Sequence, residues 1–135
     1  MMQGKFITAQ EVERESLEWG SLAWFSNPKA SGAERLVVIE VTLAPREGHN
    51  FHKHPQQEEV IYVLEGVVEQ WVGEQKRSLN SGDSAFIPAD TVHASFNVSR
   101  QPIRLLAILG PCIGAEGYEL VEVADQEPWS VLRKA

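Results

Sequence analysis

The sequence predicts an all-β fold, and two observations support this class. Residues typical of turns recur at short intervals, among them Asn27-Pro28, Ser31-Gly32 and the clusters at 45–48, 80–83 and 111–114. The segments between these turns are rich in β-branched and aromatic residues. Short strands separated by regular turn signals are typical of a β-sandwich or a β-barrel.

The predicted strands are the β-branched and aromatic runs themselves. We expect them at residues 22–25, 36–43, 59–64, 67–72, 84–87, 94–98, 103–109 and 118–123. One segment, residues 8–17, is predicted to form a short N-terminal helix, with Thr8 as its N-cap and Glu11 at the offset of a capping box.

Two predicted strands, 59–64 and 103–109, are apolar on both alternating faces, as Ile61 and Tyr62 illustrate in the first. A strand with one face in water would alternate apolar and polar residues. One face can fill the core, and a second copy of the chain is the simplest cover for the other, so we expect a homodimer. Alternatively, the N-terminal segment or the C-terminal tail through Trp129 covers the same face.

Length and composition limit the function classes. A chain of 135 residues can bury one hydrophobic core, so residues 1–135 are expected to form a single domain. The net charge of −7 and the absence of Lys and Arg clusters argue against nucleic-acid binding. No apolar run approaches the length of a membrane span, which predicts no membrane partner and a cytoplasmic location.

A group of histidines points to metal chemistry. Three of the four histidines lie within residues 48–59, together with two adjacent acids. On an extended strand, residues two apart point the same way, so His52 and His54 can both reach an ion at about 2.0–2.2 Å. The bend at Pro55 lets the chain return, and an acid on the next strand can add an oxygen ligand. A further ligand must come from elsewhere, and the remaining histidine is His93.

At these positions the sequence resembles the cupin superfamily, whose motifs are written G-x5-H-x-H-x3,4-E-x6-G and G-x5-P-x-G-x2-H-x3-N. The first motif is matched by His52, His54, Glu59 and Gly66, and the second by Gly82, Pro88, His93 and Asn97. Two positions depart from the motifs: Arg46 replaces the first glycine, with Gly48 nearby, and Asp90 replaces the inner glycine of the second motif. Asp can adopt the left-handed backbone conformation that glycine would supply, so we expect the second loop to form.

The resemblance implies a double-stranded β-helix, also called a jelly roll or cupin barrel, of the small single-domain (type 2) kind, with its motif core at residues 48–97. It also implies one divalent transition metal, which could be Fe, Mn, Ni, Zn or Co. The implied metal ligands are His52, His54, Glu59 and His93, with Glu59 also a candidate catalytic residue.

Other residues near the motifs have simpler interpretations. Strand alternation from His54 favours Glu58 as the acid ligand, but the spacing to Gly66 favours Glu59, and the turn before it resets the alternation. His49 has odd spacing from His52 and is predicted to lie on the surface. The lone cysteine, Cys112, is interpreted as a small hydrophobic residue without chemistry. Asn97 is predicted to brace a loop, and the aromatic residues Phe51, Trp71, Phe86 and Phe96 to form core.

The ligand set leaves two positions of an octahedron for water, substrate or dioxygen. The resemblance implies a dioxygenase-like enzyme that acts on a small organic substrate. Two alternatives stay open: a metal-dependent isomerase or lyase, and a non-catalytic module that binds or senses a small molecule.

Overall fold

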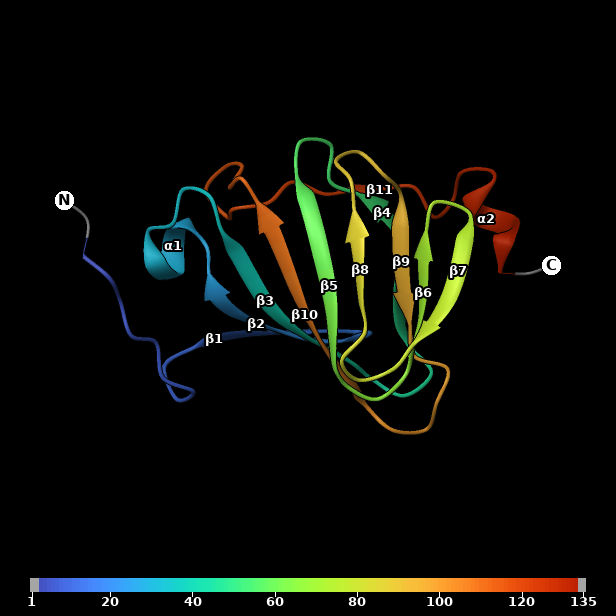
Figure 1. Cartoon of the computed structure of the whole chain (residues 1–135), viewed down its shortest axis with the longest axis horizontal. Coiled ribbons are helices and arrows are strands. Elements are labelled where there is room, and N and C mark those ends of the chain that lie inside the picture. Colours follow the sequence, from blue (N-terminus) through green and yellow to red (C-terminus); the bar gives the residue numbers. More distant parts are fainter. Residues whose placement is uncertain (1–2, 134–135) are drawn as a thin grey trace.

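The computed structural model describes residues 3–133, which are built mainly of strands (Figure 1). The elements in chain order are β1 (Glu13–Leu17), β2 (Gly20–Ser26), α1 (Pro28–Ser31), β3 (Val37–Leu43), β4 (Gly48–Lys53), β5 (Glu58–Glu65), β6 (Val68–Val72), β7 (Gln75–Leu79), β8 (Ser84–Ile87), β9 (His93–Phe96), β10 (Ile103–Gly110), β11 (Val121–Glu122) and α2 (Trp129–Leu132). The predicted all-β class is confirmed. Within the described residues, no helix has the length and apolar character needed to cross a membrane.

Two antiparallel sheets form the body of the protein (Figure 1). One sheet has the strand order β1-β2-β3-β10-β5-β8, and the other has the order β11-β4-β9-β6-β7. From β4 onward the chain passes repeatedly between the sheets, since β4 and β9 pair in the second sheet while β5, β8 and β10 belong to the first. Side chains from distant parts of the sequence can therefore meet between the sheets.

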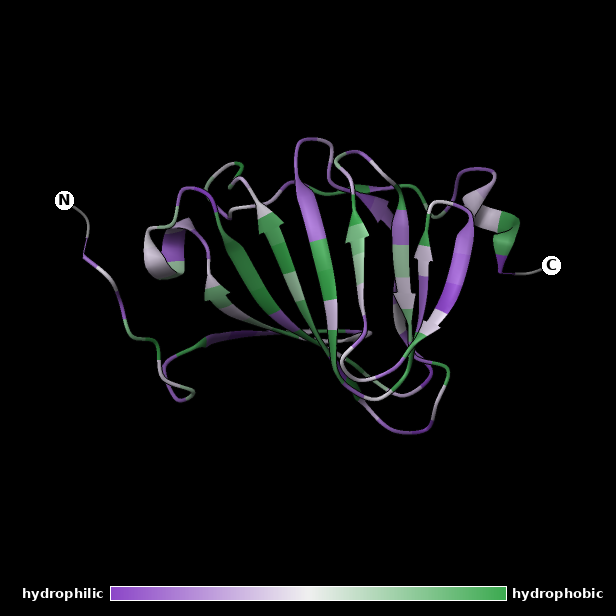
Figure 2. Cartoon of the chain, viewed as in Figure 1, coloured by the Kyte–Doolittle hydropathy of each residue, from purple (hydrophilic) through white to green (hydrophobic). Residues whose placement is uncertain are grey.

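Strands β3 and β10 supply the centre of the main core. In both strands, buried residues alternate with half-buried ones, as expected for strands with one face on the core. Their pairing places Leu105 opposite Val41 and Ala107 opposite Ile39. Burying one large aliphatic side chain contributes about 1.5–3 kcal/mol. Figure 2 shows apolar residues gathered on these central strands, whereas the edge strand β7 is hydrophilic.

A second apolar cluster lies on the outer face of the five-stranded sheet. Phe51, Trp71 and Phe96 belong to it, with ring centroids 5.5 and 5.9 Å from Phe51. Trp129 of α2 packs on Phe51 at 5.5 Å. The core prediction is thus confirmed for these three aromatic residues and wrong for Phe86, which is 56% exposed. The described part of the C-terminal tail packs on this sheet, and none of its residues lines the hollow on the outer face of β5 and β10.

The predicted helix at residues 8–17 is wrong. The carbonyl of Thr8 accepts hydrogen bonds from the backbone nitrogens of Glu11 and Val12, which closes a turn. Residues Glu13–Leu17 then form β1, which pairs antiparallel with β2. A ten-residue helix without a large face to bury is marginal. Pairing with β2 satisfies the same backbone groups and extends the sheet.

Several strand boundaries also differ from the predictions. Strand β4 was not among the predicted strands, and the ends of β2 and β9 are shifted by one or two residues. The predicted strand at 118–123 is reduced to Val121–Glu122. Strand β7, Gln75–Leu79, was not predicted because it is polar and charged. It lies at the edge of its sheet, where charged residues guard against association with other strands.

Both departures from the cupin motifs adopt the left-handed backbone conformation. Asp90 has φ 64°, which confirms its predicted role in place of glycine, and Arg46 has φ 68°. The guanidinium of Arg46 donates a hydrogen bond to the carbonyl of Val98 at 2.6 Å, which holds this turn against the neighbouring loop. Gly48 lies so close to β9 that a Cβ atom would come within 2.6 Å of the Ser95 carbonyl oxygen.

Candidate metal centre

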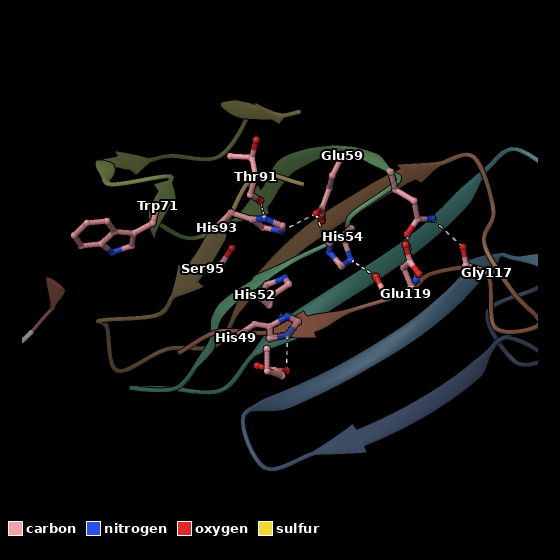
Figure 3. Close-up of polar contacts among 12 residues, drawn as sticks. His49, His52, His54, Glu59, Trp71, Thr91, His93, Ser95, Gly117 and Glu119 are labelled. Atoms are coloured by element: carbon pink, nitrogen blue, oxygen red, sulfur yellow. Dashed lines mark hydrogen bonds and ion pairs between the residues drawn. The ribbon is translucent and has the colours of Figure 1, made fainter. Parts of the chain in front are cut away.

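The four residues predicted as ligands meet between the two sheets (Figure 3). His52 on β4 lies opposite His93 on β9 in the antiparallel pairing, and His54 follows the end of β4. Glu59 comes from β5 in the other sheet. Each of the four is at most 4% exposed. One ligand atom from each histidine lies within 4.8 Å of the others.

Backbone carbonyls hold the three histidine rings in place. The Nδ1 atoms lie 2.6 Å from the carbonyl oxygen of Asn50 for His52, 2.8 Å from that of Glu119 for His54 and 2.9 Å from that of Thr91 for His93. A carbonyl oxygen can only accept, so each Nδ1 carries the hydrogen and each neutral ring presents its lone pair at Nε2. Such contacts fix the tautomer and orientation of metal-binding histidines.

The carboxylate of Glu59 faces two of these Nε2 atoms. Its Oε1 lies 2.8 Å from Nε2 of His93 and 3.3 Å from Nε2 of His54. Among the described residues, Glu59 Oε1 and His93 Nε2 are the fully buried side-chain polar atoms without a well-aligned hydrogen-bond partner. Two acceptor atoms this close require a proton or a cation between them. Because nitrogen and carboxylate oxygen are donors that divalent transition metals accept, these residues fit the predicted metal.

The pKa values describe the charge of the cluster before a metal binds. Burial alone would raise the pKa of Glu59, but its contacts with His54 and His93 outweigh burial and lower the pKa to about 2. Burial would lower the pKa of His54, but the contact with Glu59 and the Glu119 carbonyl raise it above 6.5. Burial, followed by the proximity of His49, lowers the pKa of His52 well below 6.5. Glu59 is therefore anionic, and His54 holds a proton more tightly than an ordinary imidazole.

His49 is not at the surface as predicted. Its ring stacks on His52, with centroids 3.7 Å apart, and on Trp19 at 4.8 Å, and it lines the cavity beside the cluster. The pairing register shifts between His49 and His52, because a bulge adds one residue and resets the alternation. At the bulge, the Asn50 side chain accepts a hydrogen bond from the nitrogen of Phe51. This asparagine was the local signal of an irregular strand. Burial lowers the pKa of His49 to about 4.

The remaining predicted residues lie as expected. Glu58 is exposed beside the buried Glu59, so the spacing to Gly66 identified the acid that points inward. Cys112 is half-buried against the main core and is not among the residues that line the cavity. Asn97 holds its loop through hydrogen bonds from its side-chain nitrogen to three backbone carbonyls.

Gln57 is a residue of the site that sequence reasoning missed. It is 1% exposed, and its amide nitrogen donates to the carbonyls of Pro111 and Gly117 at 2.7 and 2.9 Å. Its amide oxygen accepts from the nitrogen of Glu119 at 3.3 Å. Glu119 in turn presents its carbonyl to His54. Gln57 therefore anchors the segment that orients one of the histidines.

We expect Gln57→Leu to lower metal affinity about 10–100-fold, which is the usual range for a residue that orients a metal-binding side chain without contacting the metal. The Glu119 carbonyl would lose its anchor, so His54 would be less well oriented. Competition with a chromophoric chelator measures the affinity, and circular dichroism verifies the fold. The matched control is Gln75→Leu on the exposed strand β7. A folded Gln57→Leu protein with unchanged metal affinity would contradict this role.

The cluster forms one end of a cavity of about 260 Å³ between the sheets. Aliphatic side chains from the six-stranded sheet form much of its wall, and Trp19 and Tyr118 add aromatic surface. The ring of Tyr118 packs against Trp24 and His54 at 5.5 and 5.6 Å. Burial, and then the charges of nearby glutamates, raise the pKa of Tyr118, so its hydroxyl stays protonated at neutral pH. Ligand pockets usually measure about 300–1,000 Å³, and this cavity lies just below that range, which limits its ligand to a small molecule.

Fold and site together define a class of protein: a barrel of two antiparallel sheets with three histidines and a glutamate directed into its cavity. A comparison of the sequence with protein families agrees, since the profile of the family described as "Cupin domain" matches residues 39–109. The chain belongs to the cupin family. Solved structures described as a double-stranded β-helix domain and as an RmlC-like cupin share the fold, which confirms the predicted double-stranded β-helix.

Relatives of this chain have several activities. Polyketide synthase CurC of Streptomyces cyaneus is 27% identical over 110 residues, which cover 82% of this chain and 71% of the relative. Quercetin 2,3-dioxygenase of Bacillus subtilis is 35% identical over 60 residues, which cover 44% of this chain and 18% of the relative. The structure of the polyketide cyclase RemF from Streptomyces resistomycificus matches with TM-score 0.74 at 21% identity, over 97% of this chain and 94% of that one. Solved structures of decarboxylase and isomerase type share the fold as well.

Proposed function

We propose that this cupin is a metal-dependent enzyme of the dioxygenase-like kind that acts on a small organic substrate. One divalent transition metal, chosen from Fe, Mn, Ni, Zn and Co, would be held by His52, His54, His93 and Glu59. The observation that carries the proposal is the fixed tautomer of all three histidines, which present Nε2 within one cluster, together with the buried Glu59 carboxylate that faces two of these Nε2 atoms, those of His54 and His93. The similarity of part of the chain to a quercetin 2,3-dioxygenase supports the oxygenase class.

The residues of the site have separate roles in this proposal. When bound, the ion supplies Lewis-acid polarisation of a substrate oxygen and, if it is redox-active, a site for dioxygen chemistry. The backbone carbonyls hold the three imidazoles in the geometry that binds it. Glu59 is ionised at neutral pH because its pKa is about 2. Its carboxylate can act as a ligand and, through Oε1, receive a proton from a bound substrate. The apolar wall keeps bulk water away from this end of the cavity.

Elemental analysis followed by oxygen-uptake assays tests the proposal. The metal of the purified protein is determined first, and the protein is then reloaded separately with each of the five candidate ions. Flavonols, diketones and thiol acids are assayed for dioxygen consumption, with His52→Ala as the inactive control. We expect uptake with at least one redox-active ion and one substrate. Substrate conversion without oxygen uptake would instead indicate an isomerase or lyase, and binding without turnover would indicate a binding or sensing module.

We also propose that the chain forms a homodimer through the outer face of the six-stranded sheet. Exposed apolar residues gather there, with Leu36 57% exposed, Phe86 56% and Tyr62 38%. Strand pairing places Val60 beside Phe86 and Ile108 on the same face, and a hollow between them opens outward. Such a patch is typical of a protein interface. The tail that could have covered it packs on the other sheet, and a two-fold interface buries both copies of the patch at once.

Phe86→Asp is expected to convert the dimer into a monomer, because the new carboxylate would be buried without a partner at the centre of the interface. Light scattering coupled to size-exclusion chromatography measures the mass in solution. The control is Val98→Asp, which places the same charge at a residue that is 48% exposed outside this face. A wild-type monomer, or a Phe86→Asp protein that keeps the dimer mass, would disprove this interface.

A further inference from the structure

The wall of the cavity is mainly apolar outside the histidine cluster. Beyond the cluster, most lining residues are aliphatic, among them Leu22, Ile39, Val41 and Leu105 on the strands of the six-stranded sheet. A ligand that reaches the cluster must therefore lie against hydrocarbon for most of its length. Burial of apolar surface favours such a ligand by about 25 cal/mol per Å², whereas each hydroxyl left without a partner there carries a desolvation cost.

Few groups are available to bind a polyhydroxylated ligand. Among the described residues, no Asn, Gln, Thr, Lys or Arg side chain lines the cavity. The hydroxyl of Ser95 does line it, but it donates a hydrogen bond to the side-chain oxygen of buried Gln70 at 2.6 Å. The hydrogen-bonding groups that remain beyond the cluster are those of Tyr118, Trp19 and His49 and two carboxylates. Aliphatic surface would therefore face most hydroxyls of a sugar, and each hydroxyl left without a partner there carries a desolvation cost.

The charges around the cavity oppose anionic ligands. Besides Glu59, the lining includes Glu15 and Glu122, which are both exposed to solvent, and Glu122 lies opposite His52 in the pairing of β11 with β4. In the described part of the chain, neither forms an ion pair with Lys or Arg, and the nearest basic group to Glu122 is the His49 ring, 3.9 Å away. A divalent ion with Glu59 would carry a net charge of +1, and the two further carboxylates make the surroundings negative. Repulsion from these carboxylates disfavours the binding of an anionic ligand.

We propose that the cavity selects an uncharged, largely apolar molecule that presents one enol–ketone pair of oxygens to the histidine cluster, and that it rejects phosphorylated sugars and dicarboxylates. This inference rests on the proposed metal-dependent function and specifies its substrate class. The cluster supplies the polar contact for the two oxygens, the aliphatic wall packs on the rest of the molecule, and Glu15 and Glu122 repel anions at the entrance.

Two chelators of opposite character test the inference. Maltol is a neutral hydroxypyranone that chelates through an enol and a ketone oxygen, and oxalate is a dianion that also chelates through two oxygens. Each is titrated into Co(II)-loaded protein at neutral pH and followed by the visible spectrum of the metal, with glucose 6-phosphate as a third probe. We expect maltol to bind at least ten times more tightly than oxalate, and glucose 6-phosphate to leave the spectrum unchanged.

A double substitution tests whether Glu15 and Glu122 cause the selectivity against anions. In the Glu15→Gln/Glu122→Gln double variant, oxalate should bind at least three times more tightly while maltol binding changes little. The matched control, Glu11→Gln/Glu74→Gln, removes two exposed carboxylates outside the cavity and should keep the wild-type ratio. Oxalate binding equal to or tighter than maltol binding, or equal ratios in the two double variants, would overturn the inference alone. Failure of the wild-type protein to retain Co(II) would overturn the proposed function together with it.

Discussion

His93→Ala is expected to lower metal affinity more than about 100-fold. Loss of about 100-fold is the usual upper limit for residues that only orient a metal ligand. The variant loses a ligand itself, and His93 lies at the centre of the cluster, opposite His52 and 2.8 Å from Glu59. The remaining carboxylate and two imidazoles would leave the ion with more positions open to water. Metal content per protomer after dialysis, measured by mass spectrometry, should fall from near stoichiometric to near zero.

The same variant should keep its fold. The main core is formed by residues of β2, β3, β5, β6, β8 and β10, and none of the four candidate ligands belongs to it. Circular dichroism and thermal unfolding of the metal-free proteins verify this point. The control is His49→Phe, which preserves the stack between Trp19 and His52 but removes the imidazole nitrogens. His49→Phe should retain the metal, and a His93→Ala protein that retains it as well would refute the ligand assignment.

Metal binding is also expected to weaken as the pH falls, beginning above pH 6.5. In the metal-free protein the pKa of His54 is raised from 6.5, so this ring still carries a proton at a pH where an ordinary imidazole has lost it. Below that raised pKa, the metal must displace the proton, and affinity falls about tenfold per pH unit for each proton displaced. His52 and Glu59 do not add to this slope near neutrality, because their pKa values are lowered.

Metal competition titrations across the neutral range measure the slope, and proton release in weakly buffered solution measures it independently. We expect displacement from His54 to release about half a proton per metal at the raised pKa of this ring, more as the pH falls further, and less as it rises. Affinity that is constant from mildly acidic to mildly alkaline pH would show that His54 is not displaced from a proton by the metal. It would therefore count against His54 as a ligand.

The strands could be predicted wherever the pattern of apolar residues along the sequence determines which side chains are buried. In β10 and β3, alternation of buried and half-buried residues follows directly from the apolar pattern. Strand β1 could not be predicted in this way, because its exposed polar residues carry no core signal and its backbone is ordered by pairing with β2. Similarly, nothing in the composition of the tail shows that Trp129 packs on Phe51 of the five-stranded sheet.

The residues of the candidate site could be predicted at the positions that the motifs include. They could not be predicted where the backbone departs from the regular alternation of side chains along a strand. Spacing to Gly66 selected Glu59 over Glu58, which the structure places inward and outward respectively. A bulge next to Asn50 turned His49 into the cavity, although simple alternation placed it outside. Gln57 acts through a segment that lies more than fifty residues further along the chain, and such a contact is visible only in three dimensions.

The most direct test of the metal site is a crystal structure of the metal-loaded protein with anomalous diffraction collected at the absorption edge of the bound ion. We predict one anomalous peak per protomer, about 2.0–2.2 Å from Nε2 of His52, His54 and His93 and from a carboxylate oxygen of Glu59. An ion held by other side chains, or no peak at this position in a fully loaded protein, would contradict the proposed metal site.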